Sequence, residues 1–168
     1  TQYFGLTEQN KVLQENFASQ LETSSLGSLL YLNDTIAIRD TSRKKLFDAI
    51  PAQVVYNTAN KANNVFVINK GTDHGIQKNM GVISAEGVAG IVRSSNARYS
   101  VVMSLLNTDM NIIPSIHGQE YYTKLAWDND LANSMQINGL NKLEKIAVGD
   151  LVTTGQSSLL FPRGIPIG

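Results

Sequence analysis

Residues 69–92, with the sequence NKGTDHGIQKNMGVISAEGVAGIV, decide the fold class of this chain. Two short apolar segments, 81–84 and 88–94, flank the turn-forming residues 85–87. The glycines lack the GxGxxG spacing of a dinucleotide-binding fingerprint, and no helical segment follows them to point its N-terminus at a phosphate. The stretch therefore predicts a β-hairpin that turns at residues 85–87.

The chain after Pro51 consists of short β-prone segments separated by turn-forming residues. Segments that recur about every 10 to 12 residues, with no helical period between them, indicate an antiparallel barrel or sandwich. This part of the chain is long enough for one large barrel or two small ones. The predicted strands are residues 52–58, 64–69, 81–84, 88–94, 99–106, 111–116, 120–127, 134–140 and 150–154.

Two parts of this β-rich region resemble each other. NMGVIS (79–84) and AVGDLVTT (147–154) both place a glycine shortly before an apolar strand that ends in Ser or Thr. Two related small barrels would produce this similarity. The general preference for glycine at the start of a strand after a turn would produce it as well.

Residues 6–32 contain few chain-breaking residues and predict a helix of about seven turns. Its apolar stripe is narrow, because polar side chains occupy the other faces. Such a stripe suits pairing with a second helix in a coiled coil, and docking on the chain's own domain is the alternative. For self-association the pattern selects Leu13, Phe17, Leu21 and Leu30.

Residues 33–51 join this predicted helix to the β-rich region. Their basic residues include the cluster SRKKLF (42–47), but nearby acidic residues cancel most of its charge. The segment is therefore interpreted as a solvated connector rather than as a patch for a membrane or a nucleic acid.

The composition excludes several classes of protein. The 168 residues include 14 Lys and Arg against 14 Asp and Glu, and this neutral balance argues against a nucleic-acid binder, which needs a basic face. The chain has no cysteine, which excludes disulfides and a cysteine nucleophile. No run reaches the roughly 18 apolar residues that cross a bilayer. Because the first residue is Thr1, we expect a processed product or a fragment whose missing part could hold a signal or an anchor.

Few residues could carry catalysis. His74 and His117 lie in predicted turns, and Ser157, the best candidate nucleophile, lacks the glycine that tight oxyanion-hole turns usually require. Asp128 and Asp130 could bind calcium or act as an acid/base pair, but a strand-terminating turn explains them better. The two histidines match no metal-binding motif. We therefore predict a structural or interaction protein with no catalytic residue, no metal and no cofactor.

Residues 69–92 also resemble the hallmark of a known family, the rod shape-determining MreC proteins. Members carry a pattern of the kind NKGxxxGIxxxMxVxxxxGxVGxV, and Ala89 stands here where the family usually has Val. The segments VVMSLLNTDMNI (101–112), VGDLVTTG (148–155) and FPRGIPIG (161–168) agree with the family in order as well. The resemblance thus extends over most of the chain.

The resemblance implies a mainly β protein in which an N-terminal α-helix, a coiled coil, precedes two small six-stranded antiparallel β-barrels. On this plan residues 1–32 form the helix, 33–51 the connector, 52–108 the first barrel and 109–168 the second. The family continues beyond FPRGIPIG with a strand that completes the barrel, so the last segment here is expected to lack a partner. Whether the two barrels exchange strands stays open.

The resemblance also implies a non-enzymatic scaffold of the bacterial cell-elongation (rod) complex, which maintains cell shape by binding and organising peptidoglycan synthases. Such a protein lies on the periplasmic face of the inner membrane, anchored by a single membrane helix that this chain does not include. It forms homodimers or larger assemblies, and it binds the elongation transpeptidase, a penicillin-binding protein, and other proteins of the rod complex. For the partner surface we select Tyr121, Tyr122 and Trp127, because aromatic anchors dominate binding hot spots.

Two other classes are alternatives to this interpretation. A periplasmic adaptor of the membrane-fusion type also joins a coiled coil to small β-domains, but it has a helical hairpin where one helix is predicted here. A degenerate barrel hydrolase would depend on Ser157, His74 or His117. Alanine at these three positions would abolish its activity and would leave a scaffold intact.

Overall fold

The chain divides into two units, Thr1–Pro51 and Ala52–Gly168, and each unit is described by itself. Apart from one short 3-10 turn, η1 (Thr72–His74), all regular structure in the described residues is antiparallel β, which confirms the mainly β fold class. Most of the predicted helix, residues 6–28, lies outside the described residues. The computed structural model describes residues 29–32, 35–39, 45–117, 119–120, 124–129, 134–140, 146–155 and 160–167.

The first unit contains a three-stranded antiparallel sheet. Its strands, in order across the sheet, are β1 (Leu29–Leu32), β2 (Thr35–Arg39) and β3 (Lys45–Ala49). The prediction of a helix through Leu32 and of a solvated connector over residues 33–51 is therefore wrong, and Leu30 lies in a strand. The physical reason is local: β-branched residues in β2 favour extended backbone, and Asn33 and Asp34 are residues typical of hairpin turns.

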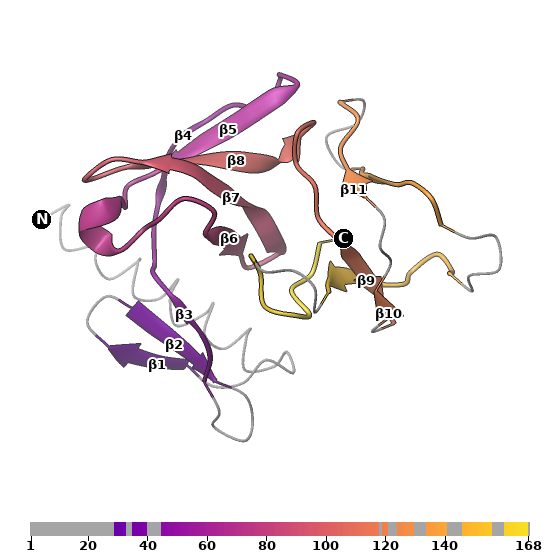
Figure 1. Cartoon of the computed structure of the whole chain (residues 1–168), viewed down its shortest axis with the longest axis horizontal. Helices are drawn as coiled ribbons and strands as arrows, with labels where there is room; N and C mark the ends of the chain where they lie inside the picture. Colours follow the sequence, from indigo (N-terminus) through magenta and orange to yellow (C-terminus); the bar gives the residue numbers. More distant parts are fainter. Residues whose placement is uncertain are drawn as a thin grey trace, which may run out of the picture. The chain divides into compact units, whose positions relative to one another are not determined.

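The second unit contains a five-stranded antiparallel sheet with the order β4-β5-β8-β7-β6 (Figure 1). Each strand overlaps a segment that the sequence predicts, because alternation and turn residues act locally. Ala85 and Glu86 join β6 to β7, which confirms the predicted hairpin. The strands are β4 (Val54–Asn57), β5 (Asn63–Ile68), β6 (Gly81–Ser84), β7 (Gly87–Ser95) and β8 (Ser100–Asn107).

Every pair of neighbouring strands in this sheet contains a register shift. Such bulges bend the strands and increase the local twist of a sheet. This sheet still ends in two edge strands, β4 and β6, and the described residues supply no strand that pairs with both. The closed six-stranded barrel implied by the resemblance is therefore not formed within the described part of the chain, because closure needs that pairing.

Buried side chains on β5, β7 and β8 contribute to the core of the second unit. Burial alternates along β5, where Phe66 and Ile68 are buried and their neighbours are partly exposed. Val92 on β7 and Val102 on β8 are among the most deeply buried residues. Full burial of each such apolar side chain contributes about 1.5–3 kcal/mol to stability.

Two buried asparagines tie β5 to β8. The Nδ2 of Asn64 donates to the carbonyl of Leu106 at 2.8 Å, and the Nδ2 of Asn107 donates to the carbonyl of Asn64 at 3.0 Å. The Oδ1 atoms of Asn64 and Asn107 accept the backbone N–H groups of Lys61 and Asp109. A buried polar group without a partner costs about 1–3 kcal/mol, and these bonds remove that cost.

The rest of the second unit forms two smaller antiparallel sheets. One has the order β10-β9-β13, and in the other β11 pairs with β12; neither is a closed barrel within the described residues. The division of the second unit at residues 108 and 109 stays a prediction. The strands are β9 (Pro114–Ile116), β10 (Gln119–Glu120), β11 (Leu125–Ala126), β12 (Gln136–Ile137) and β13 (Val152–Thr154).

The C-terminal segment 160–167 (yellow in Figure 1) contacts both β13 and the five-stranded sheet. Pro166 forms a bridge with Thr153, and its carbonyl accepts the N–H of Val88 at 2.9 Å. Phe161 and Ile165 are buried. The expectation that this segment lacks a partner is therefore wrong, because its backbone pairs with β13 and its apolar side chains join the core.

Candidate interaction surface at the 147–150 turn

A tight turn at residues 147–150 precedes β13. The N–H of Asp150 donates to the carbonyl of Ala147 at 3.2 Å, and the N–H of Ala147 donates back to Oδ2 of Asp150 at 2.7 Å. Gly149 has a φ of 100°, a left-handed conformation that glycine adopts most easily. The turn is therefore closed twice, once by the backbone and once by a side chain.

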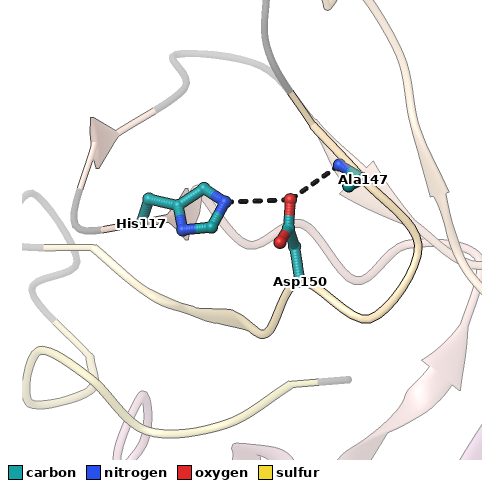
Figure 2. A network of polar contacts seen from close by, with 3 residues as sticks. All are labelled: His117, Ala147 and Asp150. Atoms are coloured by element: carbon teal, nitrogen blue, oxygen red, sulfur yellow. Dashed lines mark hydrogen bonds and ion pairs between the residues drawn. The ribbon is translucent and has the colours of Figure 1, made fainter.

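The same carboxylate also reaches the end of β9. Nε2 of His117 lies 2.9 Å from Oδ2 of Asp150, and Figure 2 shows His117 and Ala147 approaching this oxygen from opposite sides. His117 follows β9 with a φ of 51°, so it too stands in a turn. The Asp150 side chain is 17% exposed and that of His117 is 61% exposed. The carboxylate of Asp150, which is largely shielded from solvent, thus connects two turns that lie far apart in the sequence.

These contacts shift the ionisation of Asp150. The N–H of Ala147 is the main cause that lowers the pKa of Asp150, and the hydrogen bond from His117 lowers it further. Desolvation acts in the opposite direction and is smaller than these hydrogen-bond effects. The carboxylate is therefore held in its charged form, which is the form that accepts both hydrogen bonds.

Three exposed apolar side chains lie within or beside the 147–150 turn in the sequence. Val148 at the tip is fully exposed, Leu151 after the turn is 56% exposed, and Ile146 before it is 37% exposed. Turn tips normally carry polar residues, so a valine at the tip, with an exposed apolar residue on each side of it, is unusual. We call Ile146, Val148 and Leu151 the apolar tip.

A second exposed apolar stretch lies on the edge strand β4. Val54, Val55 and Tyr56 are all more than half exposed, and all four residues of the strand are exposed. Val55 is the extra residue in the register shift between β4 and β5. Natural sheets use such bulges at their edges to prevent pairing with other chains, so this strand is a weaker candidate for a contact surface than the apolar tip.

Within the described residues, the structure does not support the partner surface that was predicted from aromatic residues. Trp127 is only 4% exposed, so its prediction as a surface anchor is wrong. It directly follows β11, whose Leu125 is buried and bridges to Ile112. Large apolar rings are buried wherever packing allows it. Tyr121 and Tyr122 lie outside the described residues, and so do Leu13, Phe17 and Leu21 of the predicted helix.

The residues considered for catalysis have structural roles in the described part of the chain. His74 closes the η1 turn, because its Nδ1 accepts the N–H of Gly71 at 3.3 Å. His117 is engaged by Asp150, and no described serine hydroxyl is hydrogen-bonded to it; Ser157 lies outside the described residues. Among the residues that the structure describes, no group of three or more His, Asp or Glu side chains is close enough to hold a metal ion.

The turn predicted at Asp128 and Asp130 lies only partly within the described residues. It follows β11, and Asn129 has a left-handed φ of 66°. The carboxylate of Asp128 accepts a hydrogen bond from Nε2 of Gln136, beside the paired strands β11 and β12. Asp130 lies outside the described residues.

Sequence reasoning did not find the apolar tip or the contact between His117 and Asp150. The sequence carried a local signal for the apolar tip, since a valine beside a Gly-Asp turn is exposed by the turn itself. The sequence carried no signal for the contact between His117 and Asp150, because only the pairing of β9 with β13 brings these two residues together. Within the described residues, no helix is long and apolar enough to cross a bilayer.

The fold and this surface define a class of protein. Such a protein is built from small antiparallel β-sheets, and polar side chains hold its turns in place. One of the turns displays apolar side chains. Comparison with known families then identifies the family. The family described as rod shape-determining protein MreC, barrel core, matches residues 54–168, which is more than half of the chain. The chain therefore belongs to the MreC family of cell shape-determining proteins.

Individual relatives agree with this assignment. The cell shape-determining protein MreC of Listeria monocytogenes is 26% identical over 141 residues, which are 82% of this chain and 47% of the relative. This chain thus spans about half the length of that curated relative.

Solved structures show the same fold. The crystal structure of MreC from Pseudomonas aeruginosa has a TM-score of 0.60 at 20% identity, covering 69% of this chain and 74% of that one. A structure of MreC from Listeria monocytogenes has a TM-score of 0.64 at 22% identity, covering 99% of this chain and 74% of that one. The major periplasmic domain of the cell shape-determining filament MreC is 26% identical with a TM-score of 0.58, covering 70% and 72%.

Proposed function

We propose that this chain is the periplasmic region of a non-enzymatic scaffold that maintains cell shape by binding and organising peptidoglycan synthases. Membership of the MreC family, over residues 54–168, is the observation that supports this proposal most directly. A relative of 26% identity is described as the major periplasmic domain of a filament, which supports a periplasmic location and self-assembly.

In this proposal the full-length protein is anchored by a single membrane helix on the periplasmic face of the inner membrane. A coiled-coil helix, containing Leu13, Phe17 and Leu21, brings copies together, and two six-stranded barrels follow it. The binding partners are the elongation transpeptidase, a penicillin-binding protein, and other members of the rod complex. The displayed apolar tip supports a protein that works by contact, since exposed apolar clusters mark interaction sites.

A direct binding measurement tests the proposal. The chain is immobilised, and the periplasmic part of the elongation transpeptidase from the same organism is applied over a concentration series in biolayer interferometry. We expect saturable binding, with a Kd in the micromolar range typical of transient interfaces. An unrelated periplasmic protein of similar size is the control. Binding no stronger than that of this control would contradict the proposed function.

A further inference from the structure

The 147–150 turn has a structural counterpart at residues 77–80. There the N–H of Met80 donates to the carbonyl of Gln77 at 3.3 Å, and the N–H of Gln77 donates back to Sδ of Met80 at 3.3 Å. The third residue, Asn79, has a left-handed φ of 71°, as Gly149 has in the other turn. Both turns are thus closed by the same pair of bonds.

Each turn leads into a strand: β6 begins directly after the first turn, and β13 begins one residue after the second. The similarity seen in the sequence is therefore a repeated structural unit, although the glycines that suggested it are not equivalent. Asn79 occupies the place of Gly149, and Gly81 occupies the place of Leu151. The repeat offers an internal comparison of what this turn needs in order to form.

The two copies differ in their apolar residues. Lys78 stands at the tip where the second copy has Val148, and both are exposed. Before the turn, Ile76 is buried whereas Ile146 is partly exposed. After the turn, Gly81 is covered by Phe161, whose ring would lie 2.6 Å from an added Cβ, whereas Leu151 is exposed. The first copy shows that the turn forms without an apolar tip, so Val148 and Leu151 are not required for the turn itself.

We propose that the apolar tip is the docking contact of this chain, and that Val148 enters an apolar pocket on a protein partner. This inference rests on the proposed function, because it takes the peptidoglycan synthase as that partner. The double closure of the turn pre-organises the tip, which reduces the ordering cost of binding. The contact between His117 and Asp150, which are 33 positions apart in the sequence, further restrains the turn.

The chemistry of the tip selects the kind of partner. Asp150 is the only ionisable residue among residues 146–151, and its carboxylate is occupied by Ala147 and His117. No cationic side chain in these six residues is available to bind a phosphate or a lipid headgroup. Three exposed apolar side chains with no exposed charge of their own fit a pocket lined by apolar side chains.

The experiment exchanges one tip for the other. Val148→Lys gives the second turn the tip residue of the first, and Lys78→Val is the matched control in the turn that is not proposed to bind. Both variants of the whole chain are measured against the periplasmic part of the elongation transpeptidase by biolayer interferometry. We expect Val148→Lys to raise Kd by about tenfold or more, as loss of a central apolar anchor does, and Lys78→Val to leave Kd unchanged.

Two further measurements keep the outcome decisive. Because Val148 is exposed and the equivalent position accepts lysine, the melting temperature of Val148→Lys should match that of the unaltered chain. Leu151→Lys, at the flank of the tip, should weaken binding as well. Equal Kd values for the unaltered chain and for Val148→Lys would overturn the inference and leave the proposed function standing. Failure of the unaltered chain to bind would overturn both. A change in self-association alone, seen by light scattering, would overturn the assignment to a synthase.

Discussion

Asp150 shows how one side chain can hold two turns of a surface together. Its carboxylate accepts the N–H of Ala147 and meets His117 from β9, so the turn before β13 is tied to the turn after β9. The charged form makes these contacts, which is why the pKa of Asp150 lies below its usual value. The stability of the apolar tip is therefore linked to pH.

The sign of that link follows from the direction of the shift. A carboxyl group whose pKa is lowered in the folded state stabilises the fold fully above its unfolded pKa, which is about 4 for aspartate. The stabilisation is lost as the pH falls through the lowered folded value. We therefore predict that the unaltered chain is more stable than Asp150→Asn at neutral pH, and that the difference disappears in acid. Urea unfolding at a series of pH values from neutral to about 2 measures it.

Asp73→Asn is the matched control for this prediction, because Asp73 lies on the exposed η1 turn and is distant in the sequence from Asp150 and its partners. A constant difference in stability between the unaltered chain and Asp150→Asn at every pH would show that the carboxylate acts through shape alone. The sequence could not have suggested the experiment. His117 and Asp150 are each ordinary turn residues until strand pairing brings them together.

At the scale of elements, the sequence predicts strands and turns, which depend on neighbouring residues, better than burial, which depends on long-range packing. All nine predicted strands of the second unit overlap observed strands, and the hairpin at residues 85–87 is confirmed, because alternation and turn chemistry act over a few residues. The first sheet was missed because leucines in residues 26–32 also match a helical period. Trp127 was misplaced because its residue type does not report its burial, which depends on distant strands.

The contact between the C-terminal segment and β7 provides a prediction at this scale. A Cβ on Gly87 would lie 2.1 Å from the carbonyl oxygen of Pro166, and Gly87 has a φ of 135°. Gly87→Ala must therefore displace Pro166 from the N–H of Val88. We predict a loss of about 2–4 kcal/mol in the free energy of unfolding, measured by urea denaturation.

Gly149→Ala separates the two causes of that loss. Gly149 also has a left-handed φ, but an added Cβ there would meet no atom within 4 Å. Backbone strain alone should cost about 1–2 kcal/mol. If Gly149→Ala proves as destabilising as Gly87→Ala, the close packing of Pro166 on β7 contributes little, and the C-terminal segment is less important to the sheet than the contacts indicate.

At the scale of the whole molecule, a single apolar tip is a small contact surface. Stable protein interfaces bury roughly 1,200–2,000 Å² in total, far more than one turn can provide. A scaffold can compensate by presenting several copies, because tethered copies raise the effective concentration of the second contact. The predicted helix would supply that valency, so the two parts of the proposal are coupled.

Disruption of the predicted helix stripe tests this coupling. Changing Leu13 and Phe17 together to Asp places charges on the stripe, so we predict a shift of the purified chain from dimer to monomer in light scattering. Ser19→Asp with Ser25→Asp adds the same charge to the face of the predicted helix away from the stripe and should leave the mass unchanged. On a surface coated densely with the synthase, the monomeric variant should dissociate faster than the dimer, whereas its binding to a single synthase in solution should be unaltered. An unchanged mass for Leu13→Asp with Phe17→Asp would remove the helix from assembly, and the apolar tip would then have to act one copy at a time.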